Sequence, residues 1–322
     1  MKKIGFVLLA LLNSLLVFGN ESISIGILNG PSSIPTGYMM KNVSEIDGAN
    51  LSFEKFADPK ALLPKLLKKE VDIGFLPVNV AAKVFNSSNG AIKVAAITGN
   101  GNIALVTKDK SIKDLDDLEN KKVYVAGQGA TPDYLFRYLL DANDVEVREE
   151  GDDWGVELDF SIPTPQIAPS LLSDKITYAV VPEPFISVMQ IKSKDVRVPI
   201  DFQKEYKKAT GEDDDYPLTV MVVTKDFAEN NADLLEEFLD EYKDSYKWTV
   251  KNPKKAGVLS EELDLGFKKP IAEKAIPKSN YCFVEAEDGQ EAIESLLQLF
   301  LDFAPESIGG KLPTEDFYFV ED

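Results

Sequence analysis

Two copies of one local pattern constrain this sequence most. The stretch VDIGFLPVNVAAKVF, residues 71–85, has a short apolar run that stops at Pro77, after which a helical pattern begins. The stretch ITYAVVPEPFISVMQ, residues 176–190, repeats this arrangement around Pro182, and the match at this offset extends into the preceding helix without a gap. A strand that ends at a proline and opens a helix, made twice in the same order, predicts two related α/β units.

A second pair of segments lies upstream of the first pair. IGILNGPSSIPTGYMM (25–40) and VYVAGQGATPDYLFRY (123–138) both run from an apolar strand through a glycine loop into a helix, and Gly30 falls on Gly129. Because strand–loop–helix units are common, one match carries little weight, but two matches in the same order indicate two similar halves.

Apolar runs of strand length alternate with amphipathic helical patterns along most of the chain. Such alternation predicts an α/β protein with parallel sheets covered by helices on both faces. The nine expected strands are Ser24–Leu28, Leu51–Phe56, Ile73–Leu76, Val94–Ile97, Ile103–Thr107, Val123–Ala126, Val156–Phe160, Tyr178–Val181 and Leu218–Val223. From Phe227 onward the pattern is mostly helical.

Four loops at the ends of these strands are candidates for a binding site. In open parallel sheets, ligands bind beyond the carboxyl ends of the strands, at the starts of the following helices. Free N–H groups at a helix start suit an anion or a carbonyl-like oxygen, and Ser33 and Thr131 are expected to be N-caps. Taken singly, each loop is more simply an ordinary cap or turn, but four at equivalent places predict a site. The loops are 30–33, 77–79, 127–131 and 182–184.

Two segments suggest how the halves are joined. IALVTKDKS (103–111) and LTVMVVTKDFA (218–228) share Val-Thr-Lys-Asp after an apolar strand. If the chain leaves the first half near Thr107 and returns near Val222, the protein has two lobes connected by two hinge strands. The expected division is residues 20–106 plus 223–322 for one lobe and 107–222 for the other.

The N-terminus predicts export. Residues 1–19 have a basic start and an apolar core, followed by a polar stretch, which is the pattern of a signal peptide cleaved after Gly19. The alternative is a permanent membrane anchor, but the apolar core is short for a span. A lipoprotein signal would need a cysteine at the cleavage point, and none is there. We therefore expect a periplasmic or secreted protein.

Composition argues against several functional classes. The net charge of −19 disfavours nucleic acid and anionic membranes as partners. The chain has no histidine, which excludes nucleophilic catalysis of the Ser-His or Cys-His type, and its one cysteine, Cys282, makes a zinc site improbable. The acidic runs at 149–155 and 211–217 could supply paired carboxylates, although solvated loops are the simpler interpretation. We expect no cofactor and no enzymatic activity.

Four motifs in this order resemble the solute-binding proteins of ABC importers. They are KLLKKEVDIGFLPVNVAAKVF, GQGATPDYLFRYLL, YAVVPEPF and VMVVTKDFAENNADLLEEFL, and the resemblance is closest to the nitrate, taurine, sulfonate and thiamine-precursor branch. It implies a two-lobed periplasmic-binding-protein fold of type II, with two crossover hinge strands. It also implies a monomer that captures a small-molecule ligand and delivers it to a membrane-bound permease and ATPase complex.

The resemblance also implies where the ligand contacts lie. Carried over by position and by the loops above, they are Gly30, Ser32, Ser33, Pro77, Asn79, Gly129, Ala130, Thr131 and Glu183. None of the four loops contains Arg, Lys or His, which disfavours a small inorganic anion held by ion pairs. Glu183 would favour a ligand with a donor or a positive group. The alternative function is a secreted enzyme or a ligand sensor on the same fold, although the related thiamine-pyrimidine synthases use histidine.

Overall fold

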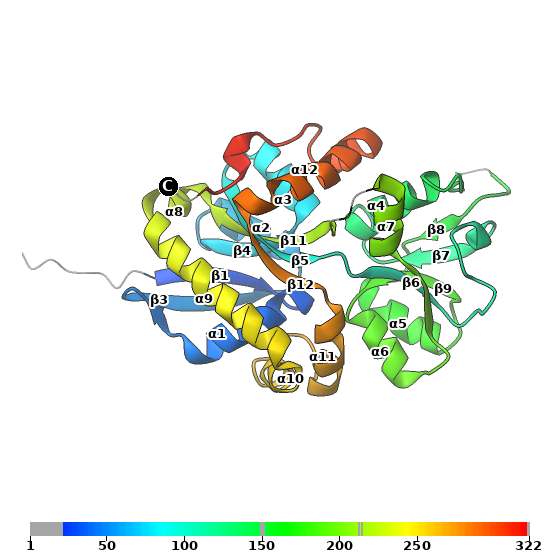
Figure 1. Ribbon diagram of the computed structural model, residues 1–322, viewed down its shortest axis with the longest axis horizontal. Coiled ribbons are helices and arrows are strands. Elements are labelled where there is room, and N and C mark those ends of the chain that lie inside the picture. The colour runs from blue at the N-terminus through cyan, green and yellow to red at the C-terminus, as the bar shows by residue number, and fades with distance from the viewer. Residues whose placement is uncertain (1–21, 149–151, 212, 214, 321–322) are drawn as a thin grey trace, which may run out of the picture.

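A computed structural model describes residues 22–148, 152–211, 213 and 215–320, and Figure 1 shows two α/β bodies side by side. The expected signal peptide, residues 1–19, lies outside the described residues, as do parts of both acidic runs. No helix within the described ranges is long and apolar enough to cross a membrane.

The described strands form one seven-stranded and one five-stranded sheet. The first has the order β12 (Tyr281–Glu285), β5 (Ile92–Asn100), β11 (Pro217–Thr224), β4 (Ile73–Pro77), β1 (Ser22–Leu28), β3 (Ala49–Phe56) and β2 (Glu45–Ile46). The second has the order β10 (Arg197–Asp201), β6 (Ile103–Thr107), β9 (Tyr178–Pro182), β7 (Lys122–Val125) and β8 (Glu157–Asp159). Each of the nine expected strands overlaps an observed strand, and β2, β10 and β12 are additional.

The expectation of parallel sheets is only partly right. β1 is parallel to β3 and β4, and β7 is parallel to β8 and β9. β11, however, is antiparallel to both β4 and β5, and β6 is antiparallel to both β9 and β10. Both sheets are therefore mixed. Their antiparallel pairs include the strands next to the chain crossings.

The helices cover both faces of each sheet, and we call each sheet with its helices a lobe. On the first lobe these are α1 (Gly37–Asn42), α2 (Pro59–Leu67), α3 (Val78–Ser87), α8 (Lys225–Asn230), α9 (Ala232–Lys251), α10 (Pro253–Glu262), α11 (Lys269–Ala275) and α12 (Ala286–Phe303). On the second lobe they are α4 (Thr131–Asp141), α5 (Thr164–Leu172), α6 (Phe185–Lys192) and α7 (Phe202–Thr210).

Alternation along the first-lobe strands supplies two cores. Ile73 and Phe75 of β4 join the cluster under α1 and α9, whereas Leu76 joins the cluster under α2, α3 and α12. The glycines of β1 and β4 let α2 approach closely, because a Cβ on Gly26 would lie 2.4 Å from the Leu62 side chain. Burial of this apolar surface is the main stabilising contribution to the lobe.

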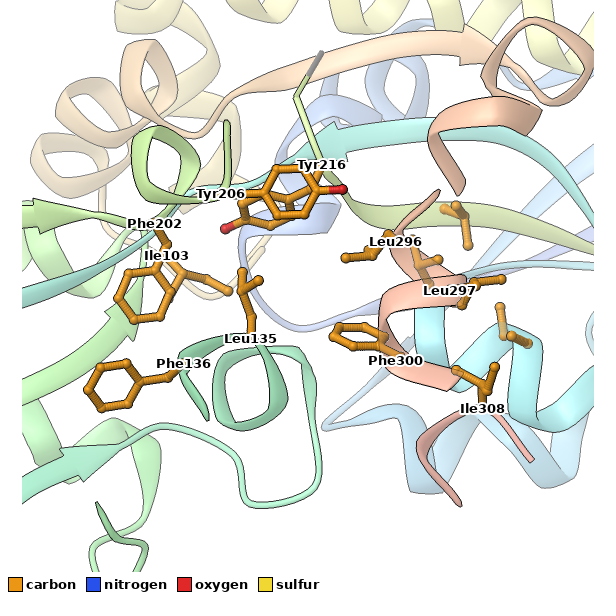
Figure 2. Close-up of a cluster of buried hydrophobic side chains, with 14 of the residues drawn as sticks. Ile103, Leu135, Phe136, Phe202, Tyr206, Tyr216, Leu296, Leu297, Phe300 and Ile308 are labelled. Atoms are coloured by element: carbon orange, nitrogen blue, oxygen red, sulfur yellow. The ribbon is translucent and has the colours of Figure 1, made fainter. Parts of the chain in front are cut away.

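One of these cores continues into the second lobe. Leu135 and Phe136 of α4 belong to the same hydrophobic cluster as Leu297 and Phe300 of α12, although Phe136 points toward Phe202 of the second lobe (Figure 2). Tyr134 of α4 and Phe300 have ring centroids 6.1 Å apart. The two lobes therefore share apolar contacts on the α12 side of the molecule.

The chain crosses between the sheets at two places within the described residues. β5 ends at Asn100 and β6 begins at Ile103, and the return lies between Thr210 of α7 and Pro217 of β11. The expected boundaries at 106/107 and 222/223 thus fall one strand too late, because β6 pairs in the second sheet and β11 in the first. The division into a lobe of 22–100 plus 217–320 and a lobe of 103–210 replaces them as our proposal.

Candidate functional site

A cavity of about 200 Å³ lies where the two lobes meet, beside both chain crossings. Five of the nine expected site residues line it: Ser32, Pro77, Ala130, Thr131 and Glu183. The other lining residues are Pro31, Thr98, Gly99, Asn100, Asn102, Ile103, Pro132, Pro182, Leu218, Thr219, Ser279 and Tyr281. The structure therefore brings together residues from all four expected loops.

The loop after β1 places its two serines differently. It forms a short 3-10 helix, Pro31–Thr36, in which Ser32 is half-buried and lines the cavity. Ser33 is fully buried, and its hydroxyl donates to the carbonyl oxygens of Gly30 at 2.7 Å and Leu265 at 3.3 Å. Neither Gly30 nor Ser33 lines the cavity, and Ser33 is not the expected N-cap because its hydroxyl is used to fix the loop.

Asn79 and Thr131 join the two lobes. Thr131 begins α4 without capping it, which corrects the expectation of an N-cap. Its hydroxyl oxygen lies 3.2 Å from Oδ1 of Asn79 on α3, and both side chains are 1% exposed. Asn79 does not line the cavity but positions Thr131, which does.

The backbone of the glycine loop before α4 is hydrogen-bonded to a side chain of α4. Gly129 has a φ of +72°, which glycine adopts readily. Its N–H donates to Oδ2 of Asp133 at 2.9 Å, and Arg137 donates to the other oxygen of Asp133 at 2.7 Å. Gly129 does not line the cavity, and its N–H is already paired rather than free for a ligand, contrary to the expectation from a helix start.

Glu183 lies at the end of β9 and is 3% exposed. Its two carboxylate oxygens accept hydrogen bonds from the backbone N–H of Ser187 at 3.0 Å and from the Ser187 hydroxyl at 3.1 Å. Burial raises the pKa of the Glu183 carboxyl above its ordinary value, while the Ser187 hydrogen bonds and the nearby Lys278 and Lys274 oppose that rise. The carboxylate therefore satisfies the first turn of α6 as well as lining the cavity.

Sequence reasoning missed the residues on the crossing strands. Thr98, Gly99, Asn100 and Asn102 come from the end of β5 and the first crossing, and Thr219 comes from β11. The run TGNGN at 98–102, rich in glycine and asparagine directly before a strand, was the available signal. Ser279 and Tyr281, before and within β12, carried no comparable signal.

A second hollow of about 440 Å³ adjoins the first. The two share Asn102, Ile103 and Glu183, and the second also reaches Asp201, Gln203 and Lys278. In the part of the chain that the structure describes, no group of three or more acidic or cysteine side chains could hold a metal ion.

Comparisons with known proteins agree with this architecture. The model of the NMT1-like family matches residues 30–261, a range that holds all nine expected site residues. An ABC transporter structure from Parabacteroides distasonis is 25% identical, with a TM-score of 0.79 over 94% of this chain and 99% of that chain. No curated protein sequence matches the chain.

Two further structures extend the likeness to the expected branch. The periplasmic aliphatic sulphonate binding protein SsuA from Escherichia coli has a TM-score of 0.70 at 14% identity, over 90% of this chain and 96% of that chain. The periplasmic nitrate-binding protein NrtA from Synechocystis has a TM-score of 0.65 at 12% identity, over 93% and 87%. The expected periplasmic-binding-protein fold and family resemblance are thus confirmed.

Proposed function

Because this chain belongs to the NMT1-like family, we propose that it is the extracytoplasmic solute-binding component of an ABC-type import system. In this role it would capture one small organic solute between its lobes and deliver it to a permease and ATPase complex. The structural neighbours described above as ABC transporter, sulphonate-binding and nitrate-binding proteins support the general role. A periplasmic or secreted location and a monomeric state are part of the same proposal.

The cavity at the junction of the lobes is the observation that carries this proposal. Pro77, Thr219 and Ser32 line it from the first lobe, and Thr131 and Glu183 line it from the second. A solute held there contacts both lobes, so that its binding energy favours the closed arrangement over an open one. The two crossings, at 101–102 and between 210 and 217, are the segments that could act as hinges.

Apart from the apolar contacts between α4 and α12, the lobes are joined by individual hydrogen bonds and ring contacts among the described residues. Besides the Thr131–Asn79 hydrogen bond, Lys278 donates to Oε1 of Gln190 at 2.8 Å, and the rings of Phe185 and Phe267 lie 6.4 Å apart. Single hydrogen bonds contribute about 0.5–1.5 kcal/mol each. A solute present at 100 times its Kd would add about 2.7 kcal/mol, which is comparable with the hydrogen bonds between the lobes.

Native mass spectrometry tests the proposal directly. The chain from residue 20 onward, purified without dialysis, should carry one retained small molecule that is released on unfolding. Small-angle scattering before and after removal of that molecule should show expansion of the protein. A chain that retains no solute, and whose melting temperature no member of a broad solute library raises, would contradict the proposal. Chemical conversion of the retained molecule would instead favour an enzyme.

A further inference from the structure

The polar side chains that line the cavity fall into two groups. In the first group, each side chain makes at least one hydrogen bond to the protein, although Oδ1 of Asn102 is buried without a partner among the described residues. Thr131 contacts Asn79, Glu183 accepts from Ser187, and Asn102 donates from Nδ2 to the carbonyl oxygen of Ser279 at 3.0 Å. The remaining members are Tyr281, whose hydroxyl donates to Pro31 O at 2.7 Å, Ser279, which donates to Ala275 O at 3.0 Å, and Thr98, which donates to Thr219 O at 3.4 Å.

The second group consists of Ser32, Asn100 and Thr219. All three side chains are partly exposed, and none makes a hydrogen bond to another residue within the described ranges. All three belong to the first lobe. Apart from Oδ1 of Asn102, the side-chain groups that are available to a solute therefore belong to the first lobe.

The sheet places these three residues close to one another. Across β11 and β5, Thr219 pairs with Gly99 and Pro217 pairs with Asn100, so Thr219 and Asn100 lie on adjacent strands at the same end of the sheet. Tyr281 of β12 pairs with the same Gly99 from the other side. Since the Tyr281 hydroxyl donates to Pro31 O, it also ties the loop that carries Ser32 to this part of the sheet. Ser32, Asn100 and Thr219 all line the cavity from the first lobe, and we call them the polar wall.

The side chains of the polar wall are uncharged, and each can both donate and accept hydrogen bonds. A side-chain amide offers donors and an acceptor, and each hydroxyl can do both. Glu183 is the one acidic or basic side chain among the described lining residues, and both its oxygens are engaged by Ser187. An anionic solute would lose its hydration without gaining a counter-charge from the lining residues, and a cationic solute would gain only a carboxylate that is shared with Ser187. The prolines, Leu218 and Ile103 leave the rest of the lining apolar.

From this arrangement we propose that the solute is a neutral organic molecule with a donor and an acceptor on one edge, as in a carboxamide or lactam, and that Asn100 determines this specificity. The inference rests on the proposed function and adds the chemical class of the solute. Asn100 can pair with such an edge through both ends of its amide, while Ser32 and Thr219 supply hydroxyls from the same lobe. The second lobe then covers the apolar remainder.

Three six-membered-ring probes of nearly equal size test the class. δ-Valerolactam has a donor and an acceptor, δ-valerolactone has acceptors alone, and piperidine is a cationic donor at neutral pH. Titration calorimetry on solute-free protein should give a Kd for the lactam about tenfold lower than for either of the others, as expected for one or two additional hydrogen bonds. Equal or tighter binding of the lactone or piperidine overturns the proposal.

Variants then assign the specificity to Asn100. Asn100→Ala should weaken lactam binding about tenfold. Asn100→Asp should shift preference toward piperidine, because a carboxylate lacks the donor and supplies a counter-charge. Ser32→Ala should weaken lactam binding, whereas the control Ser173→Ala should leave the Kd unchanged, since the Ser173 hydroxyl donates to Ser170 O at the end of α5, outside the cavity. Unchanged selectivity in Asn100→Asp, with the fold intact by circular dichroism, overturns the assignment.

The two proposals fail in different ways. If native mass spectrometry finds no retained solute and no library member or ring probe binds, solute binding itself is wrong. If a solute is retained, but it is charged or the lactam does not bind, solute binding stands and the neutral class is wrong.

Discussion

The two copies of the strand–proline–helix unit use their polar side chains in opposite ways. In the first copy, Asn79 follows Pro77 and contacts Thr131 of the other lobe. In the second copy, Glu183 follows Pro182 and contacts Ser187 of its own helix. One backbone unit thus serves as a contact between lobes in one half and as support for a helix start in the other. Similar local sequence patterns do not carry similar functions when their polar residues differ.

Removing the Glu183 carboxylate is expected to have the largest effect. Glu183→Ala leaves the buried N–H and hydroxyl of Ser187 without their acceptor, and an unsatisfied buried donor costs about 1–3 kcal/mol. We expect the free energy of unfolding to fall by about 2–3 kcal/mol, measured by urea denaturation. Glu183→Gln retains one acceptor oxygen and should lose less. If both variants kept wild-type stability but lost solute affinity, Glu183 would act on the solute rather than on α6.

The same carboxylate predicts a pH dependence. Because burial raises the pKa of Glu183 in the folded protein, the folded state holds this proton more firmly than the unfolded state does. The contribution of this group to the free energy of unfolding is then greatest at low pH and is lost as pH rises from the ordinary range of a glutamate to the raised pKa. The stability difference between wild type and Glu183→Gln should fall across that window. A difference that rises with pH would contradict the sign.

The Thr131–Asn79 contact between the lobes should show an energetic coupling in the free energy of unfolding. Thr131 and Glu183, which share no hydrogen bond, should show none. Thr131→Val and Asn79→Ala each remove one partner of the 3.2 Å contact. A double-mutant cycle on the free energy of unfolding should give a coupling of about 0.5–1.5 kcal/mol. Thr131→Val with Glu183→Gln is the matched control, because no direct hydrogen bond joins that pair, and it should be additive. Additivity in both cycles would remove the distinction between the two copies.

The smallest effect is expected from the exposed bridge between the lobes. Lys278 and Gln190 are joined at 2.8 Å on the surface of the molecule. Exposed polar pairs contribute little because water competes for both groups. Lys278→Ala should therefore change the free energy of unfolding by less than about 0.5 kcal/mol, in the same urea assay. A larger loss of stability would show that the closed arrangement depends on this exposed hydrogen bond as much as on the Thr131–Asn79 contact.

The sequence was most informative where apolar runs end at proline or glycine. β4 and β9 are such runs, and their loops meet at the cavity as their equivalent positions predict. β10 was missed because it is a sheet-edge strand with Pro199 inside an exposed, weakly apolar segment. Asn100 and Thr219 were missed because they lie on crossing strands, and only pairing between distant segments brings them to the same wall.

Local patterns also failed to show how polar groups pair with one another. Ser33 and Asn79 have the residue types expected of ligand contacts, yet each contacts a partner distant in sequence, Leu265 and Thr131 respectively. Glu183 has a local partner, but that bond depends on where the first turn of α6 begins. Such pairings follow from tertiary packing, which a single sequence does not reveal.

The position of β5 in its sheet has a consequence for how the protein is made. β5 lies between β11 and β12, and Val94 also accepts a hydrogen bond from the backbone of Phe319. All of these partners are synthesised after the second lobe, whose strands end at Asp201. The second lobe can therefore fold during synthesis, whereas β5 has an unpaired edge until β12 has emerged. Unpaired edges favour aggregation. A chain kept unfolded until synthesis is finished avoids this hazard, which suits the export route proposed for this protein.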